Sequence, residues 1–183
     1  MTRPDASEFD SYFAPYIDRV PGSDVVAVLR AQLDAVATVF ESAPAAARGR
    51  GYEEGKWTME EVFAHVVDSE RVFSTRALMF ARGHDDIAQP GMDQDVMIDH
   101  ARATERGIEA IAAEFRALRT ANLFLFEAFD AAAWSRSGLA SGVPMSVRAL
   151  VYLIAGHADH HVEVVQQRYL PATAQKSSRN DRP

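Results

Sequence analysis

The sequence predicts an all-α protein built as a four-helix bundle. Four segments carry apolar residues at alternating spacings of three and four, which is the repeat of one helix face. No segment shows the alternation of a β-strand, and the connectors contain glycine and proline. The 183 residues fit one domain, residues 1–183, that is large enough to bury a core. A polar tail, residues 172–183, is expected to fray.

Residues 1–21 form a predicted arm in which aromatic side chains lie between helix-breaking residues. Pro21 and Gly22 separate this arm from the first helix. Four rings left in water would create a large apolar surface, so we expect an irregular arm that packs them on the bundle. The four aromatic residues are Phe9, Tyr12, Phe13 and Tyr16.

The first helix is predicted over residues 24–42, where apolar side chains recur at helical spacing. Ser23 has a side chain typical of an N-cap residue, and Asp24 suits the positive end of the helix dipole. Pro44 lies just beyond the last turn, where it ends the helix. Residues 45–55 follow as a connector that contains three glycines.

The second helix is predicted over residues 58–82. Thr58 and Glu61 have the spacing of a capping box, and Gly83 fits the position after a helix end. His65 lies two turns into the helix among apolar neighbours, where a single histidine is more often a core residue than a ligand. The inward stripe of this helix comprises Val62, His65 with Val66, Ser69, Phe73, Arg76 with Ala77, and Phe80.

Two carboxylates, Asp68 and Glu70, follow His65 on the same predicted helix. Each can be a solvated charge on the helix surface. Each can also support a metal ligand or move a proton close to a metal ion. The sequence leaves both interpretations open.

Residues 83–99 are predicted as a loop, because glycine, aspartate and proline are frequent there. A connection of this length is often functional, for instance as a lid over a site, but it can also be a plain connector. The third helix is predicted over residues 103–129, which keep the apolar stripe. Residues 130–143 form the last connector.

The fourth helix is predicted over residues 146–170, and the proline at position 171 ends it. His157 and His161 lie four residues apart on its inward line of apolar residues, while His160 lies at the edge of that line. Two imidazoles at this spacing project the same way, so they can share one transition metal ion. They can also be hydrogen-bonded core or surface residues.

Composition narrows the possible classes of function. The formal net charge is −7 and no basic run is present, which argues against nucleic acid and against an anionic membrane surface as partners. The absence of cysteine excludes disulfides, thiolate metal ligands and a cysteine nucleophile. The N-terminus lacks an apolar signal core, and no apolar run approaches about 18 residues, so we expect a cytoplasmic protein.

Bundle interiors are where facing helices build metal sites. In the predicted bundle, His65 on the second helix can therefore join His157 and His161 on the fourth. Three histidine ligands with open positions are typical of a reactive site rather than a closed structural one.

Several short motifs, in this order, resemble the DinB-like or YfiT-like superfamily of metal-dependent bacterial bundle proteins. The resemblance covers residues 12–170, nearly the whole chain, and Met92 departs from it where an aromatic residue is frequent. The motifs are Gly55-Lys-Trp-Thr58 followed by His65, then Asp68-Ser-Glu-Arg-Val-Phe73, Pro90-Gly-Met-Asp-Gln-Asp95, Gly156-His-Ala-Asp-His-His161, and Arg168-Tyr-Leu170.

This resemblance implies an up-down-down-up bundle in which His65, His157 and His161 hold a divalent transition metal, with zinc or nickel expected. It also implies a homodimer, for which aromatic surfaces at residues 12–16 and 124–129 offer contacts. Relatives include transferases that use low-molecular-weight thiols and a mycothiol-dependent isomerase. Because this chain has no cysteine, such a thiol would have to be a cosubstrate.

Three hypotheses about function follow. The first is a metal-dependent enzyme, a hydrolase or thiol transferase, that acts on a small-molecule substrate. The second is a non-catalytic stress-response bundle that binds a metal or a small molecule. The third is a structural dimer scaffold whose histidines merely pack. Under the first, the candidates for orienting a ligand or moving a proton are Asp68, Glu70, Asp159 and His160.

Overall fold

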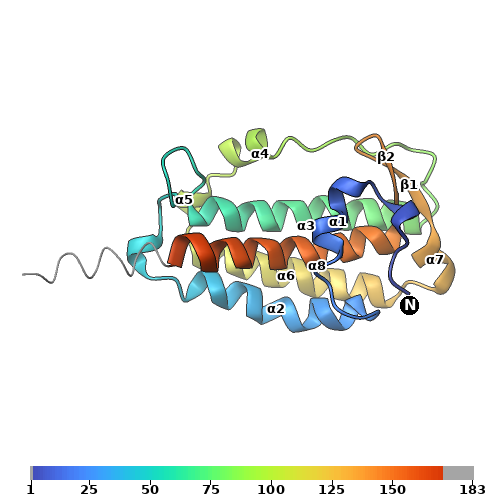
Figure 1. Cartoon of the computed structure of the whole chain (residues 1–183), viewed down its shortest axis with the longest axis horizontal. Coiled ribbons are helices and arrows are strands. Elements are labelled where there is room, and N and C mark those ends of the chain that lie inside the picture. Colours follow the sequence, from blue (N-terminus) through green and yellow to red (C-terminus); the bar gives the residue numbers. More distant parts are fainter. Residues whose placement is uncertain (1, 171–183) are drawn as a thin grey trace, which may run out of the picture.

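The computed structural model of the chain describes residues 2–170. Four long helices lie side by side and form a bundle (Figure 1). Helix α2 contacts α6 and α8, and α3 contacts the same two helices, so α2 and α3 lie diagonally across the bundle. The long helices are α2 (Val25–Glu41), α3 (Met59–Ala81), α6 (Ile108–Glu127) and α8 (Val147–Val164).

The directions of these helices give the bundle its topology. Figure 1 shows α2 and α8 running in one direction and α3 and α6 running in the other. The order along the chain is therefore up, down, down, up, which confirms the expected bundle. Because α3 and α6 are parallel, the chain must return along the whole bundle between them, which explains the long connection after residue 81.

The long connection contains more structure than the predicted loop. Helix α4 (Gln94–His100) lies within it, and the Asp93 side chain caps this helix by accepting from the backbone N–H groups of Asp95 and Val96. The connection runs back over α3 in Figure 1. It thereby places residues 91–94 over the middle of the bundle, where they line a cavity.

The predicted third helix, residues 103–129, is interrupted near its start. A short helix, α5 (Ala103–Arg106), comes first, and α6 begins only at Ile108. Gly107 lies between them with φ of +77°, a conformation that ends a right-handed helix and favours glycine. The prediction of one continuous helix was wrong at this point.

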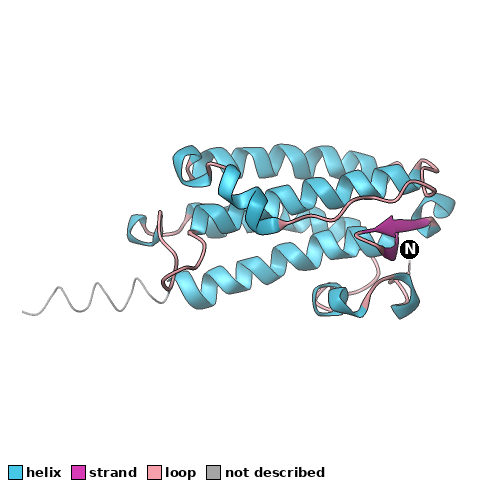
Figure 2. Cartoon of the chain, turned by 90° about the horizontal axis from the view of Figure 1, so that it is seen from above, coloured by secondary structure: helices cyan, strands magenta, loops and turns pink. Residues whose placement is uncertain are grey.

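The expectation that the chain contains no strand was also wrong. Strands β1 (Ser137–Ala140) and β2 (Val143–Ser146) pair as an antiparallel hairpin between α7 (Ala131–Ser135) and α8 (Figure 2). Residues 141 and 142 form its two-residue turn, and both have positive φ, as a type I′ turn requires. Strands of four residues are too short to show a clear alternation in the sequence.

Helix α8 begins where the sequence predicts. The Ser146 side chain accepts from the backbone N–H of Ala149 as an N-cap. The helix continues past Val164 as a π-helical turn, Val165–Tyr169, so its helical length agrees with the predicted end. The predicted tail lies outside the described residues.

The N-terminal arm is helical rather than irregular. It comprises two 3₁₀ turns, Ala6–Glu8 and Ser11–Phe13, and the short helix α1 (Ala14–Ile17). It packs on α8, as expected, but Tyr12 keeps 70% of its surface exposed. The backbone of the arm comes so close to α8 that a Cβ atom on Gly156 would lie 1.9 Å from the carbonyl oxygen of Tyr16.

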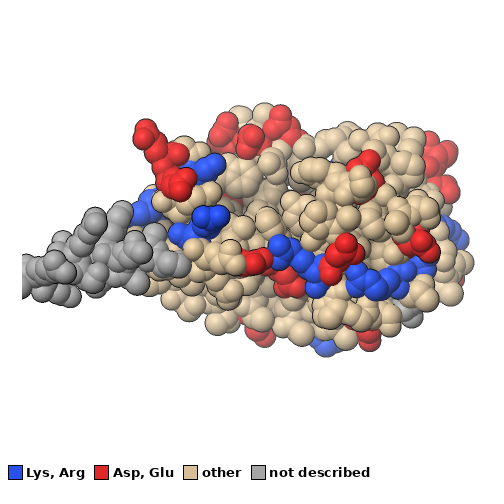
Figure 3. Space-filling model, viewed as in Figure 1, with Lys and Arg blue, Asp and Glu red and all other residues tan. Residues whose placement is uncertain are grey.

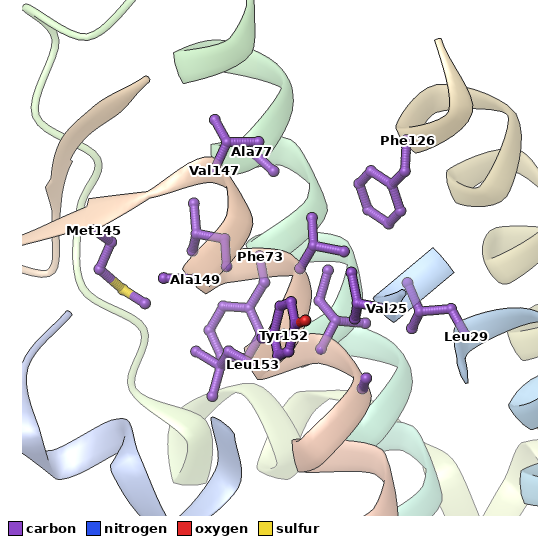
Figure 4. Packing of buried hydrophobic residues seen from close by; sticks show 14 of the residues in the cluster. Val25, Leu29, Phe73, Ala77, Phe126, Met145, Val147, Ala149, Tyr152 and Leu153 are labelled. Carbon is purple, nitrogen blue, oxygen red and sulfur yellow. The ribbon is translucent and has the colours of Figure 1, made fainter. Parts of the chain in front are cut away.

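The apolar core consists of two clusters of buried side chains. Figure 4 shows the first, where Tyr152 and Leu153 of α8 pack with Phe73 of α3 and with Val25 and Leu29 of α2. The second surrounds the stacked rings of Phe40 and Phe63 nearer the other end of the bundle. Burial of these side chains supplies most of the free energy that holds the helices together.

A buried polar network separates the two clusters. The Arg119 guanidinium, with no exposed surface, donates two hydrogen bonds of 2.8 Å to the Glu70 carboxylate. Asn122 donates to the same carboxylate, and Arg119 also donates to Gln32. The Gln32 amide donates in turn to the Asp159 carboxylate at 2.7 Å. Side chains of all four long helices therefore meet in this network.

The surface shows no extended basic area on the face seen in Figure 3, where basic and acidic side chains are interspersed. Surface arginines pair with carboxylates from other elements, as Arg116 does with Glu41. Within residues 2–170, no helix is long and apolar enough to cross a membrane. Tyr12 and Phe124 are exposed, and the homodimer expected from such rings stays a prediction.

We predict that Gly156→Ala destabilises the protein by about 1–3 kcal/mol, because the new methyl group must displace the arm from α8. The loss should exceed the gain in helix propensity that alanine normally brings. Thermal unfolding measures the change, with Gly91→Ala as the control, since a Cβ there meets open space. Equal unfolding temperatures for both variants would contradict the close contact.

We predict that Arg119→Met costs about 3–5 kcal/mol, because it leaves the Glu70 carboxylate buried without its cation. The double variant Arg119→Met with Glu70→Leu should regain much of this loss, since no buried charge remains. Urea unfolding of both single variants and the double variant gives the coupling energy. Additive effects of the two substitutions would show that the pair does not act as a unit.

Candidate metal centre

Three histidines converge from two helices. His65 comes from α3, and His157 and His161 come from successive turns of α8. The Nε2 atom of His157 lies 3.1 Å from Nε2 of His65 and 3.2 Å from Nε2 of His161. Their candidate ligand atoms all lie within 4.8 Å of one another. The structure thus brings together the three residues that the sequence proposed as ligands.

The spacing of these nitrogen atoms fits a shared metal ion. Two imidazole nitrogens, each about 2.1 Å from one ion, are about 3.0 Å apart at a right angle and about 3.4 Å apart in tetrahedral geometry. The observed separations of 3.1 and 3.2 Å lie between these values. The same distances also suit N–H···N hydrogen bonds, although Nε2 of His157 offers only one lone pair or one proton to its two neighbours.

Burial keeps the three imidazoles neutral. Desolvation, followed by the charges of neighbouring histidines, lowers the pKa of His65 to about 4 and that of His161 to about 3. The same causes hold the pKa of His157 well below its ordinary value. Neutral imidazole is the form that binds metal ions, because a ring nitrogen then has a free lone pair.

Aromatic rings surround the imidazoles, and the Ser69 hydroxyl lies 3.5 Å from Nδ1 of His65. The ring centroid of Trp57 lies 5.0 Å from that of His65. The ring centroids of Tyr16 and Phe73 lie 5.6 and 6.0 Å from that of His157. Nδ1 of His161 is buried and has no hydrogen-bond partner within residues 2–170. Packing therefore sets the ring orientations that acidic partners set in many metal sites.

A cavity of about 870 Å³ opens beside the histidines, and His65 and His157 form part of its wall. The arm closes one side of it, and residues 91–94 of the long connection close another. A cavity of this size suits a small organic molecule. The remaining wall residues are Asp10, Tyr12, Phe13, Tyr16, Phe73, Arg76, Ser141, Val143 and Leu153.

Glu70 does not lie in the wall of this cavity. Its carboxylate is 2% exposed and is occupied by Arg119 and Asn122. The structure therefore gives Glu70 a place in the buried network between the helices rather than on the surface.

The other three proton-transfer candidates also lie outside the cavity wall. Asp68 is half-buried, which raises the pKa of its carboxyl group, and it lies 3.6 Å from Arg71. Burial also raises the pKa of Asp159, which accepts the hydrogen bond from Gln32. His160 lies next to the site, with its ring centroid 5.2 Å from that of Tyr16 and 5.0 Å from that of His161.

Three residues that line the cavity were not predicted from the sequence: Tyr16, Arg76 and Ser141. Tyr16 was interpreted as a residue that covers the core or lies in a dimer contact. Arg76 carried a usable signal, because a charged residue stands in the otherwise apolar stripe of its helix. Ser141 lies in the hairpin turn, which the sequence did not reveal.

The fold resembles that of a solved protein. YfiT from Bacillus subtilis, described as a probable metal-dependent hydrolase with an unusual four-helix bundle topology, superimposes with a TM-score of 0.72. The two sequences are 13% identical, and the match covers 96% of this chain and 94% of YfiT. At this identity the likeness shows the fold alone. No curated protein matches this sequence. The family model of the DinB superfamily matches residues 28–165, and the chain therefore belongs to that superfamily.

Proposed function

We propose that this protein is a metal-dependent hydrolase of small molecules in which His65, His157 and His161 bind one divalent transition metal ion. The convergence of three neutral imidazoles beside a cavity carries the proposal. The description of YfiT, which shares the fold, supports it. We expect zinc or nickel, although imidazole ligands also suit copper and iron.

When bound, the ion would act as a Lewis acid, which polarises a carbonyl group and lowers the pKa of a water molecule or thiol bound to it. The protein supplies the ligands and their surroundings. His65 and His157 line the cavity, so a substrate inside it lies next to their rings. Phe13, Tyr16 and Phe73 exclude water from the same wall, which strengthens electrostatic interactions inside it.

The positions of the acidic groups assign them supporting roles in this proposal. Glu70 and Asp159 fix the positions of α3 and α8 through the network around Arg119 and Gln32. His160 and Asp68 lie next to the site without lining the cavity, so they act on it through neighbouring residues.

We predict that purified protein contains one metal ion per chain and that His65→Ala and His157→Ala each lose it. Removing one of three imidazoles leaves too few ligands to retain the ion. Mass spectrometry of untagged protein, purified without added metal or chelator, measures the content. His100→Ala is the matched control, because His100 is an exposed histidine on α4. Metal retained in all variants would place the ion elsewhere.

We predict that metal-loaded protein hydrolyses members of a panel of small esters and amides, and that His157→Ala lowers kcat/KM by about 100-fold or more. Parallel reactions with low-molecular-weight thiols identify a transferase, because turnover then depends on the added thiol. Absence of turnover by fully loaded protein would favour the alternative, a non-catalytic binding protein. His100→Ala should match the wild-type rate.

A further inference from the structure

Arg76 of α3 is a buried cation without an acidic partner. Its side chain lies in the cavity wall, and the residue is 4% exposed. Nη2 donates to the Pro90 carbonyl oxygen at 2.7 Å and to Oγ of Ser141 at 3.0 Å. Nε and Nη1 donate to no residue in the described part of the chain, and no carboxylate there lies within ion-pair distance.

The contrast with Arg119 shows why this arrangement is unusual. Arg119, the other buried arginine described above, meets the Glu70 carboxylate through two parallel hydrogen bonds. Arg76 has only two neutral acceptors, and burial lowers its pKa. The two nitrogens without a partner are not sealed from solvent, so they face the cavity that Arg76 lines. A planar anion in this cavity can pair with both free donors.

The position of Arg76 links this cation to the histidines. The Phe73 ring is close to both, with its centroid 5.8 Å from Cζ of Arg76 and 6.0 Å from the ring centroid of His157. Both Arg76 and His157 line the same cavity. An elongated molecule in the cavity can therefore reach both groups along one wall.

We propose that Arg76 binds a carboxylate of the ligand, and that the substrates of this site are small amphipathic monocarboxylates. Planar guanidinium and planar carboxylate match through paired hydrogen bonds. The apolar wall of Phe13, Phe73 and Leu153 accommodates the body of such a molecule. That these molecules are substrates rests on the proposed hydrolase function. Their binding to Arg76 does not depend on that function.

The other charges of the cavity disfavour a doubly charged ligand. Asp10 and Asp93 also line it, and each carboxylate accepts backbone N–H groups as a cap of a helical turn. Two carboxylates in the wall of the same cavity repel a doubly charged phosphate more strongly than a singly charged carboxylate. Inorganic phosphate is therefore the competing anion in the test.

Arg76 also borders a second, smaller cavity of about 420 Å³, which Arg71 and Thr75 line on the other side of the connection. The proposal places the carboxylate in the larger cavity, because only that one reaches the histidines. Val143→Trp fills the larger cavity alone, and Thr75→Trp fills the smaller one alone. Only the first should abolish ligand binding.

Calorimetric titration of metal-free protein with 3-phenylpropanoate, 3-phenylpropanamide and inorganic phosphate tests the proposal. We expect the carboxylate to bind at least about 10-fold more tightly than its neutral amide, and phosphate to bind more weakly than both. Arg76→Met should remove the preference for the carboxylate, and Arg76→Lys should restore part of it. Arg71→Met is the matched control, since this arginine on the same helix lines only the smaller cavity.

Equal binding of the carboxylate and the amide by the wild-type protein would overturn the proposal, even if Arg76→Met failed to fold. Unchanged carboxylate binding by a folded Arg76→Met, or loss of binding in Thr75→Trp alone, would also overturn it. These titrations need neither metal nor turnover. If the protein binds the carboxylate but contains no metal, only the proposed hydrolase function is contradicted. If it contains the metal but does not prefer the carboxylate, only the role of Arg76 is contradicted.

Discussion

The buried ion pair between Arg119 and Glu70 is the constraint on which the rest of the bundle depends. Apolar contacts between helices are not directional, so they specify the position along the helix axis less strictly than a buried ion pair does. Two charges without access to water must meet each other in one geometry. The pair, extended through Gln32 to Asp159, therefore fixes how far each long helix is shifted along its neighbours.

This fixed register determines the geometry of the histidines. Glu70 lies little more than one turn beyond His65 on α3, and Asp159 lies between His157 and His161 on α8. The network therefore controls the axial positions of the same two helices that carry the imidazoles. A separation of 3.1 Å between ring nitrogens of two different helices tolerates little sliding. The polar layer and the candidate metal centre therefore lie at neighbouring levels of the same two helices.

The sequence predicted the features that depend on local periodicity. The four helices follow from apolar spacing, and the pair His157 and His161 follows from the four-residue repeat of α8. Features that depend on distant partners were not predictable in this way. The partner of Glu70 lies 49 residues away, and nothing local distinguishes a buried acid from a solvated one. The sequence did not predict the hairpin or the helix break at Gly107, because each depends on a few residues with positive φ angles.

The cavity is a product of topology rather than of any motif. Parallel α3 and α6 require a connection that runs the length of the bundle, and this connection covers one side of α3. It brings the Pro90 carbonyl group to Arg76, while the hairpin brings Ser141 from the other side. These two contacts hold the guanidinium in place without neutralising it.

The two buried arginines differ in their partners. Arg119 pairs with a carboxylate, whereas Arg76 donates only to neutral oxygen atoms. The charge of Arg119 is compensated within the chain, so its free energy belongs to folding. The charge of Arg76 meets no carboxylate within ion-pair distance in the described part of the chain, and its free donors face the cavity. A ligand that binds only the native state adds its binding free energy to the stability of that state. Arg76 therefore offers an unpaired cation to a ligand in the same cavity that His65 and His157 line.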